Sequence, residues 1–122
     1  MSESQSAARR NGPALEAMYR FNLWLMPAVE KLPRTYKFVL GDRMQIAALD
    51  CLERLIEATY TKSRDAALGR ANLALEKLRF MFRLAYDLKL IDLKRFEHAA
   101  REIDEVGRLV GGWIRSQRAA QS

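Results

Sequence analysis

The sequence predicts an all-α fold, an up-down-up-down bundle of four helices. Apolar residues recur at three- and four-residue steps along four segments of similar length, only a few residues link the segments, and no alternating strand pattern or internal repeat occurs. A chain of 122 residues with 49% hydrophobic content can bury one sizeable core. We therefore expect a single bundle domain over residues 14–118, between a disordered tail at residues 1–13 and a disordered end at residues 119–122.

The first two predicted helices cover residues 14–31 and residues 33–61. Pro27 has no backbone N–H, so a kink or an early stop is expected near Met26 in the first helix. Pro33 suits the first turn of the second helix, and Gly41 should weaken that helix locally. The predicted core positions of the two helices are Leu15, Met18, Tyr19, Asn22, Leu25, Met26 and Val29, followed by Phe38, Leu40, Met44, Ala47, Ala48, Cys51, Leu52, Leu55, Ile56 and Thr59.

The third and fourth helices begin at predicted caps. Ser63 precedes Asp65 as an N-cap precedes a first-turn carboxylate, and the helix that follows should end near residue 88. Asp92 can cap the fourth helix, which leads into the adjacent pair Gly111 and Gly112. The predicted core positions are Leu68, Ala71, Leu75, Leu78, Phe82 and Ala85, followed by Phe96, Ala99, Ala100, Ile103, Gly107, Val110 and Ile114.

The glycine pair is unusual because each glycine inside a helix costs roughly 1 kcal/mol relative to alanine. Gly111 and Gly112 therefore either end the fourth helix or allow something to approach its backbone closely. The residues that follow, "WIRSQR", include Trp113 and Ile114, and a helix that merely stopped there would have no use for them.

The composition gives a first indication of partners. The formal net charge of +6 favours an anionic partner, although a charge that serves only solubility is an equally ordinary explanation. No apolar run approaches the roughly 20 residues of a membrane helix, and the N-terminus has no apolar block typical of a secretory signal. We expect a cytoplasmic protein without membrane contact.

Residues that could support catalysis or bind a metal are nearly absent. Cys51 falls on a predicted core stripe and is expected to be a buried structural thiol, and His98, the single histidine, is expected to lie on the surface or to pack between helices. No Cys/His cluster could hold zinc, and no glycine-rich phosphate loop follows a strand. We expect no metal, no cofactor and no enzymatic activity.

A basic ridge is predicted on the fourth helix. Glu97 and Arg101, and likewise Asp104 and Arg108, are four residues apart and should form intrahelical ion pairs. No acid follows Glu105, so the last arginines should be uncompensated, although cations near a helix C-terminus are also favoured by the helix dipole alone. The ridge consists of Lys94, Arg101, Arg108 and Arg115, which recur every seven residues.

A second basic cluster, on the third helix, contains Lys77, Arg79, Arg83 and Lys89 against Glu76 and Asp87. Arg79, Arg83 and Tyr86 should form a row that can hold phosphates and stack on a base, or else a solvated face with a tyrosine at the core edge. Apolar residues outside the main core stripes indicate a partner surface, namely Phe80, Leu90 and Trp113.

Three stretches resemble a known family. The runs "LPRTYKFVLGDR", "LEKLRFMFRLAYDLKLI" and "IDEVGRLVGGWIRS" are similar to the signature stretches of the accessory variability determinant proteins of diversity-generating retroelements. The four-helix proteins encoded by intervening sequences in ribosomal RNA genes share the bundle, and the glycine pair before Trp113 favours the retroelement type. The resemblance covers all four predicted helices.

This resemblance implies a four-helix bundle that assembles into a ring-shaped homopentamer with a basic channel, binds RNA and DNA, and associates with the retroelement's reverse transcriptase. That pair copies a template RNA into mutated cDNA. The residues it implies for nucleic-acid or polymerase contact are Arg79, Arg83, Arg108 and Arg115, with Arg34, Lys37 and Arg43 as a second group. Family members often carry a lysine where this chain has Tyr86, so the channel should be less basic there.

The family resemblance also favours one explanation of the glycine pair. If the fourth helix continues through Gly111 and Gly112, the missing side chains leave a notch for another helix, and Trp113 beside it can anchor an oligomer contact together with Phe80. Two other functions remain open: a structural or scaffolding oligomer with a protein partner only, and a small hydrolase or nuclease.

Overall fold

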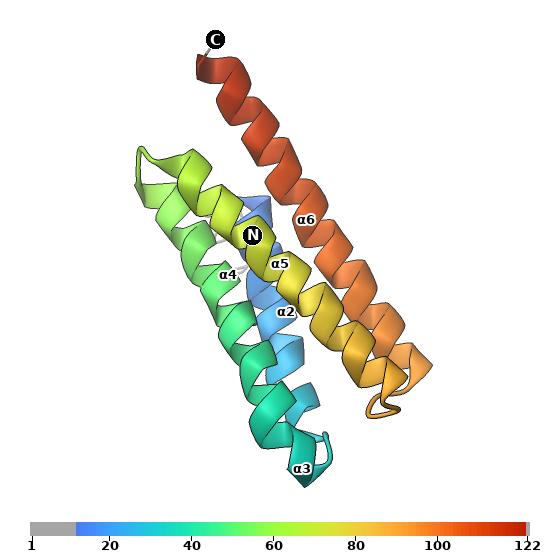
Figure 1. Cartoon of the computed structure of the whole chain (residues 1–122). Coiled ribbons are helices and arrows are strands. Elements are labelled where there is room, and N and C mark those ends of the chain that lie inside the picture. Colours follow the sequence, from blue (N-terminus) through green and yellow to red (C-terminus); the bar gives the residue numbers. More distant parts are fainter. Residues whose placement is uncertain (1–11, 122) are drawn as a thin grey trace, which may run out of the picture.

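Four long helices form the molecule. The computed structural model describes residues 12–121, with helices α2 (Pro13–Glu30), α4 (Asp42–Tyr60), α5 (Arg64–Asp87) and α6 (Leu93–Gln121), and with the short α3 (Arg34–Tyr36) and the π-helical turn η1 (Lys37–Gly41) leading into α4 (Figure 1). Successive long helices run in opposite directions and pack on one another, and α6 also packs on α2. The predicted all-α four-helix bundle is confirmed, and residues 12–121 contain no strand.

The core lies between all four helices. On α5 all six predicted positions are buried, and alanines with no exposed surface, such as Ala48, Ala71 and Ala99, let the helix backbones approach closely. On α2 the sequence pattern missed Phe21, which is fully buried. Three predicted core residues are wrong, because their side chains project to solvent: Tyr19 is 50% exposed, Phe38 61% and Ile56 42%.

Helix α2 continues through Pro27 to Glu30, so the early stop expected near Met26 is wrong. Pro27 removes only the hydrogen bond to the carbonyl of Leu23, and both residues are exposed. Water can reach that carbonyl, which makes the loss tolerable one turn before the helix ends.

The predicted second helix is one helical run with a π-helical turn in it. Gly41 ends this turn and is buried against the last turn of α2. A Cβ atom at Gly41 would lie 2.7 Å from Val29 Cγ1 and 3.3 Å from Leu32 Cδ1. The glycine therefore permits close packing between η1 and the end of α2, in addition to loosening the local helix.

The two remaining helix starts differ from each other. Ser63 is the N-cap residue of α5 and Asp65 lies in its first turn, as predicted, but the Ser63 side chain makes no capping hydrogen bond; its backbone N–H donates to Thr61 Oγ1 at 3.2 Å. The predicted cap at Asp92 is confirmed, because Asp92 Oδ1 accepts a hydrogen bond from the Arg95 N–H at 2.9 Å.

The helices extend slightly beyond both predicted domain limits, and α2 begins at Pro13, one residue before the predicted start at 14. Helix α6 extends three residues beyond the predicted limit at 118, to Gln121, and its last turns project past the α4–α5 connection (Figure 1). Most of the predicted tail, residues 1–11, lies outside the described part of the chain.

Candidate nucleic-acid interface

The basic ridge of α6 faces solvent along the whole helix. Its four members, Lys94, Arg101, Arg108 and Arg115, are all exposed. The buried positions of α6 lie on the opposite side of the helix and are Ala99, Ile103, Val106 and Val110. The seven-residue spacing thus places four cations on one accessible face, as predicted.

Arg79 does not stand free beside this ridge. Its Nη1 atom makes a close ion pair with Asp104 of α6, and its Nε atom lies 3.0 Å from Glu76 Oε1. A Cβ atom at Gly107 would be 3.0 Å from Arg79 Nη2, so the guanidinium lies directly over the α6 backbone. Arg79 therefore joins α5 to α6, and two carboxylates offset its charge.

Arg83 remains available to solvent. Its side chain is 70% exposed, and the nearest carboxylate, that of Asp87, lies 3.9 Å from its Nε atom. Arg79 and Arg83 do line one shallow cavity at the α5–α6 seam, together with Asp104. The two arginines are neighbours as predicted, and the exposed Arg83, whose one carboxylate neighbour is 3.9 Å away, is more accessible to a phosphate than Arg79.

The ion pairs of α6 differ from those predicted. Arg108 pairs with Glu105 instead of Asp104: its Nη2 atom lies 2.7 Å from Glu105 Oε1 and its Nε atom 3.1 Å from Oε2. This hydrogen bond raises the pKa of Arg108 and lowers that of Glu105. The expectation that Arg108 is uncompensated is wrong, because a three-residue spacing lets the two side chains meet in a fork.

Elsewhere on α6 the arginines lack carboxylate partners. Within residues 12–121 no carboxylate lies within 4.0 Å of the guanidinium of Arg101 or Arg115, so the predicted pair between Glu97 and Arg101 is not formed. Arg115 is the cation of the ridge nearest the glycine pair and retains its full charge.

Tyr86 is already in contact with another ring. Its ring centroid is 4.7 Å from that of Phe96, with the planes inclined by 33°. The tyrosine thus packs α5 against α6, as the core-edge alternative expected, and the predicted row of two guanidiniums and an accessible ring is incomplete.

The remaining basic residues of the prediction lie apart from the ridge. Lys37 pairs with Glu30 at 2.6 Å, at the end where α2 gives way to α3, and Arg34 is exposed beside it. Arg43 and Lys77 line a hollow between α4 and α5. The second group of predicted contacts therefore does not form one surface with α6.

The apolar residues predicted to lie outside the core divide into two kinds. Phe80 is 64% exposed, in agreement with the prediction. Leu90 and Trp113 are only partly exposed and pack against the core, so their assignment to surplus apolar surface is wrong.

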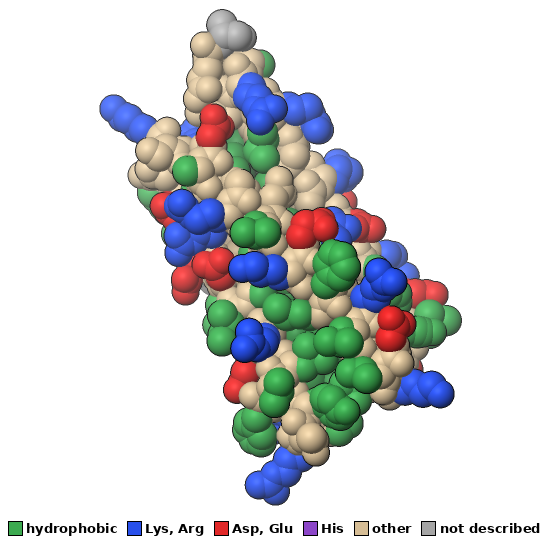
Figure 2. Space-filling view, in the orientation of Figure 1, with side chains coloured by type: hydrophobic (Ala, Val, Ile, Leu, Met, Phe, Trp, Pro, Cys, Tyr) green, Lys and Arg blue, Asp and Glu red, His purple; other side chains and the backbone are tan. Residues whose placement is uncertain are grey.

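An apolar face surrounds Phe80. We define the α4–α5 face as the exposed large hydrophobic residues of η1, α4 and α5 that accompany Phe80, and Figure 2 shows hydrophobic side chains gathered over the lower part of these helices. Its members besides Phe80 are Phe38, Val39, Ile46, Leu49, Leu73, Leu84 and Leu88. An exposed apolar surface of this kind is typical of a contact with another protein chain.

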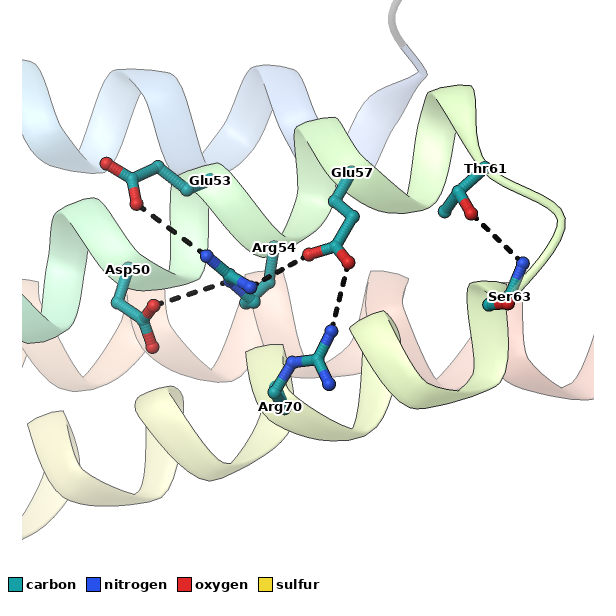
Figure 3. Close-up of polar contacts among 7 residues, drawn as sticks. All are labelled: Asp50, Glu53, Arg54, Glu57, Thr61, Ser63 and Arg70. Carbon is teal, nitrogen blue, oxygen red and sulfur yellow. Dashed lines mark hydrogen bonds and ion pairs between the residues drawn. The ribbon is translucent and has the colours of Figure 1, made fainter.

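The outer side of α4 carries a network of ion pairs that the sequence analysis missed. Arg54 lies among three carboxylates of α4, with Glu57 the nearest at 2.9 Å, and Glu57 also pairs with Arg70 of α5 at 3.0 Å (Figure 3). Spacings of three and four residues between Asp50, Arg54 and Glu57 were the available signal. With three acids against two arginines, this surface does not favour a polyanion.

Helix α6 continues without interruption through Gly111 and Gly112, so the pair does not end it. A Cβ atom at Gly111 would meet only Arg115 Nη1, at 3.5 Å, and one at Gly112 only Arg115 Nη2, at 3.8 Å. Nothing within the described chain requires glycine at either position. The space beside the α6 backbone is left for Arg115 or for a molecule from outside.

A groove opens at this end of the bundle. It has a volume of about 580 Å³ and lies between the N-terminus of α2 and the C-terminal half of α6, with the α4–α5 connection beside it. Arg64, which the sequence analysis did not select, contributes to it with Arg108 and Arg115. No aspartate or glutamate lines the groove, and of its three arginines only Arg108 has a carboxylate partner, Glu105, within the described chain.

The described residues offer no evident catalytic or metal centre. Cys51 is buried as predicted, and burial raises the pKa of its thiol to about 12. His98 packs its ring on Trp24 with centroids 4.5 Å apart, so it is a helix-packing residue. No group of three or more potential metal ligands occurs within residues 12–121.

A search for membrane-spanning helices gives a negative result. None of the helices in residues 12–121 combines the length and the apolar character needed to cross a bilayer.

Comparison with known proteins identifies a family. The model of the family described as bAvd-like matches residues 15–117, which is most of the chain and includes all four long helices. No curated protein and no solved structure matches.

Proposed function

Because this chain belongs to the bAvd-like family, we propose that it is a non-catalytic accessory protein of a diversity-generating retroelement. In this proposal it acts in the cytoplasm, binds template RNA and cDNA through basic residues, and associates with the reverse transcriptase during mutagenic retrohoming. This assignment agrees with the resemblance carried by the stretches around Gly41, Arg79 and Gly111.

The observation that carries nucleic-acid binding is the distribution of charge along α6. Beyond Glu105 the helix has arginines and no acid, and the groove beside it has three arginines and no acid. Guanidinium groups bind phosphate oxygens in a fork geometry, and contacts with phosphate do not depend on the base sequence. The α4 side, with its surplus of carboxylates, is unsuited to the same task.

Assembly is the second part of the proposal. The α4–α5 face, with Phe80 in it, offers an apolar contact area, and the glycine pair with Trp113 offers a close-approach site on α6. We assign these two surfaces to contacts between copies of the chain and with the polymerase. A homopentameric ring is the assembly that the family resemblance implies.

Binding of RNA tests the leading proposal. Fluorescence anisotropy with a labelled single-stranded RNA, repeated from low to high salt, should give an affinity that falls steeply with salt and changes little with base sequence. An affinity that stays flat across the salt series would overturn the arginine–phosphate mechanism.

A structural oligomer with a protein partner only is the second candidate. The exposed α4–α5 face favours it, because an apolar surface of this kind is suited to contact with another protein chain and does not depend on the cations. Co-purification of the reverse transcriptase with this chain, together with no measurable affinity for RNA or DNA, would support the second candidate and exclude the first.

A further inference from the structure

We propose that the groove between α2 and α6 is a nucleotide site, which takes one phosphate on its arginines and one base against Trp113. This inference rests on the proposed nucleic-acid function and deepens it, because it locates where a single nucleotide unit is held. The same chemistry is offered by a free mononucleotide and by a nucleotide within a single strand.

The cationic side of the groove is partly fixed in position. Arg64 donates from Nε to the carbonyl of Ala58 at 2.9 Å and from Nη1 to Gln117 Oε1 at 3.4 Å. These two bonds hold the guanidinium at the start of α5, and no carboxylate among residues 12–121 lies within 4.0 Å of it. A cation held by neutral partners keeps its charge for an anion and loses little side-chain entropy on binding.

Arg115 and Arg108 of α6 contribute the other two positive charges of the groove. Arg115 is exposed, has no carboxylate partner in the described chain, and lies within reach of the glycine backbone. Arg108 is held by Glu105 but is 66% exposed, so it still presents donors to the groove. Three guanidiniums converge on one concave site without an acid in its lining, which is an arrangement suited to phosphate.

The rest of the lining is apolar, which argues for more than a bare phosphate. Pro13, Ala14, Leu109 and Trp113 contribute hydrophobic surface, and Trp113 is the one aromatic residue among the lining residues. A volume of about 580 Å³ lies within the range of small-molecule sites. A base can stack on an aromatic ring only when it has left a duplex, so the site should prefer a mononucleotide or a single strand.

Gly112 accounts for access to the groove. It lines the groove, whereas its neighbour Gly111 does not. A large side chain at residue 112 would occupy the space in which the base and the Trp113 ring meet. Gly69, exposed on α5 and remote from the groove lining, provides the matched glycine outside the proposed site.

The test uses the full chain and adenosine 5′-monophosphate as the probe. Isothermal titration should give saturable binding, with ribose 5-phosphate weaker because it has no base to stack. Gly112→Leu should abolish the binding without changing the net charge, while Gly69→Leu, at an exposed position of α5 where an added Cβ atom meets nothing within 4 Å, should retain it. Arg115→Gln should weaken binding about tenfold or more, and Lys31→Gln, which removes one charge at the other end of α2, should leave it unchanged.

A second readout separates this proposal from the proposed function. A single-stranded oligonucleotide should compete with the mononucleotide for the groove, and a duplex of the same sequence should compete less well. Equal effects of Gly69→Leu and Gly112→Leu, or no saturable mononucleotide binding, would overturn the nucleotide site. If salt-dependent RNA binding persisted in that case, the proposed function would still stand. If the protein bound the mononucleotide but not RNA, the proposed function would be excluded and the nucleotide site would stand.

Discussion

Substitution of Gly41 by alanine tests the packing of the bundle where η1 meets α2. The new Cβ atom would lie 2.7 Å from Val29 Cγ1 and 3.3 Å from Leu32 Cδ1, and both neighbours are buried, with 2% and 7% of their surface exposed. Valine is stiff about χ1, so the contact cannot be relieved by a simple rotation. Overpacking of this kind costs about 1–3 kcal/mol, and the gain in helix propensity offsets about 1 kcal/mol of it.

The expected result is a net loss of up to about 2 kcal/mol in the free energy of unfolding. Gly69→Ala is the matched control, because Gly69 is exposed within α5 and a Cβ atom there would meet nothing within 4 Å. That variant should gain about 0.5–1 kcal/mol. Urea unfolding at one fixed protein concentration measures both, and the reasoning is refuted if Gly41→Ala is as stable as Gly69→Ala.

Three further predictions concern assembly, charge and pH. The double variant Gly111→Leu, Gly112→Leu should reduce the molar mass from light scattering to that of one chain, and an unchanged mass would remove the glycine pair from the interface. Asp104→Asn frees Arg79 and should raise RNA affinity at low salt, with a stability cost below about 1 kcal/mol because the pair is partly exposed; unchanged affinity would show that Arg79 takes no part. The pKa of Cys51 is raised to about 12, so burial of the neutral thiol contributes fully to the stability of the fold below the pKa of an unfolded thiol. This contribution is lost as the pH rises toward the pKa of the folded protein. Relative to Cys51→Ala, the free energy of unfolding should therefore fall by roughly 1 kcal/mol per pH unit between about pH 9 and 12, and parallel pH profiles of the two proteins would contradict this.

The sequence pattern predicted the helices well because their apolar stripes are regular. Every predicted core position of α5 is buried, and Asp92 caps α6 as expected. The pattern failed where tertiary context decides, as at Pro27, whose lost hydrogen bond falls on the exposed side of α2. It also placed Phe38 in the core although the π-helical turn η1 changes the direction of its side chain.

The candidate site was harder to predict because some of its ion pairs join residues that are close in space but far apart in the sequence. Periodicity placed Arg79 and Arg108 on the expected faces, yet it could not show that Asp104 would pair with Arg79 across two helices and leave Arg108 to Glu105. Arg64 was missed because its importance depends on the closeness of α5, α2 and α6, which no local pattern encodes. For the same reason Tyr86 could not be seen to stack on Phe96.

The central claim is that the C-terminal half of α6 binds RNA, and a comparison of two double variants tests it most directly. RNA affinity would be measured against salt for Arg108→Gln, Arg115→Gln and for Arg79→Gln, Arg83→Gln, beside the unaltered protein. We expect the α6 double variant to lower the affinity and to reduce the salt slope by about 1.4, from two lost phosphate contacts on a single strand. The α5 double variant should have a smaller effect because carboxylates already offset the charge of Arg79. A normal affinity and slope in the α6 double variant would contradict the account.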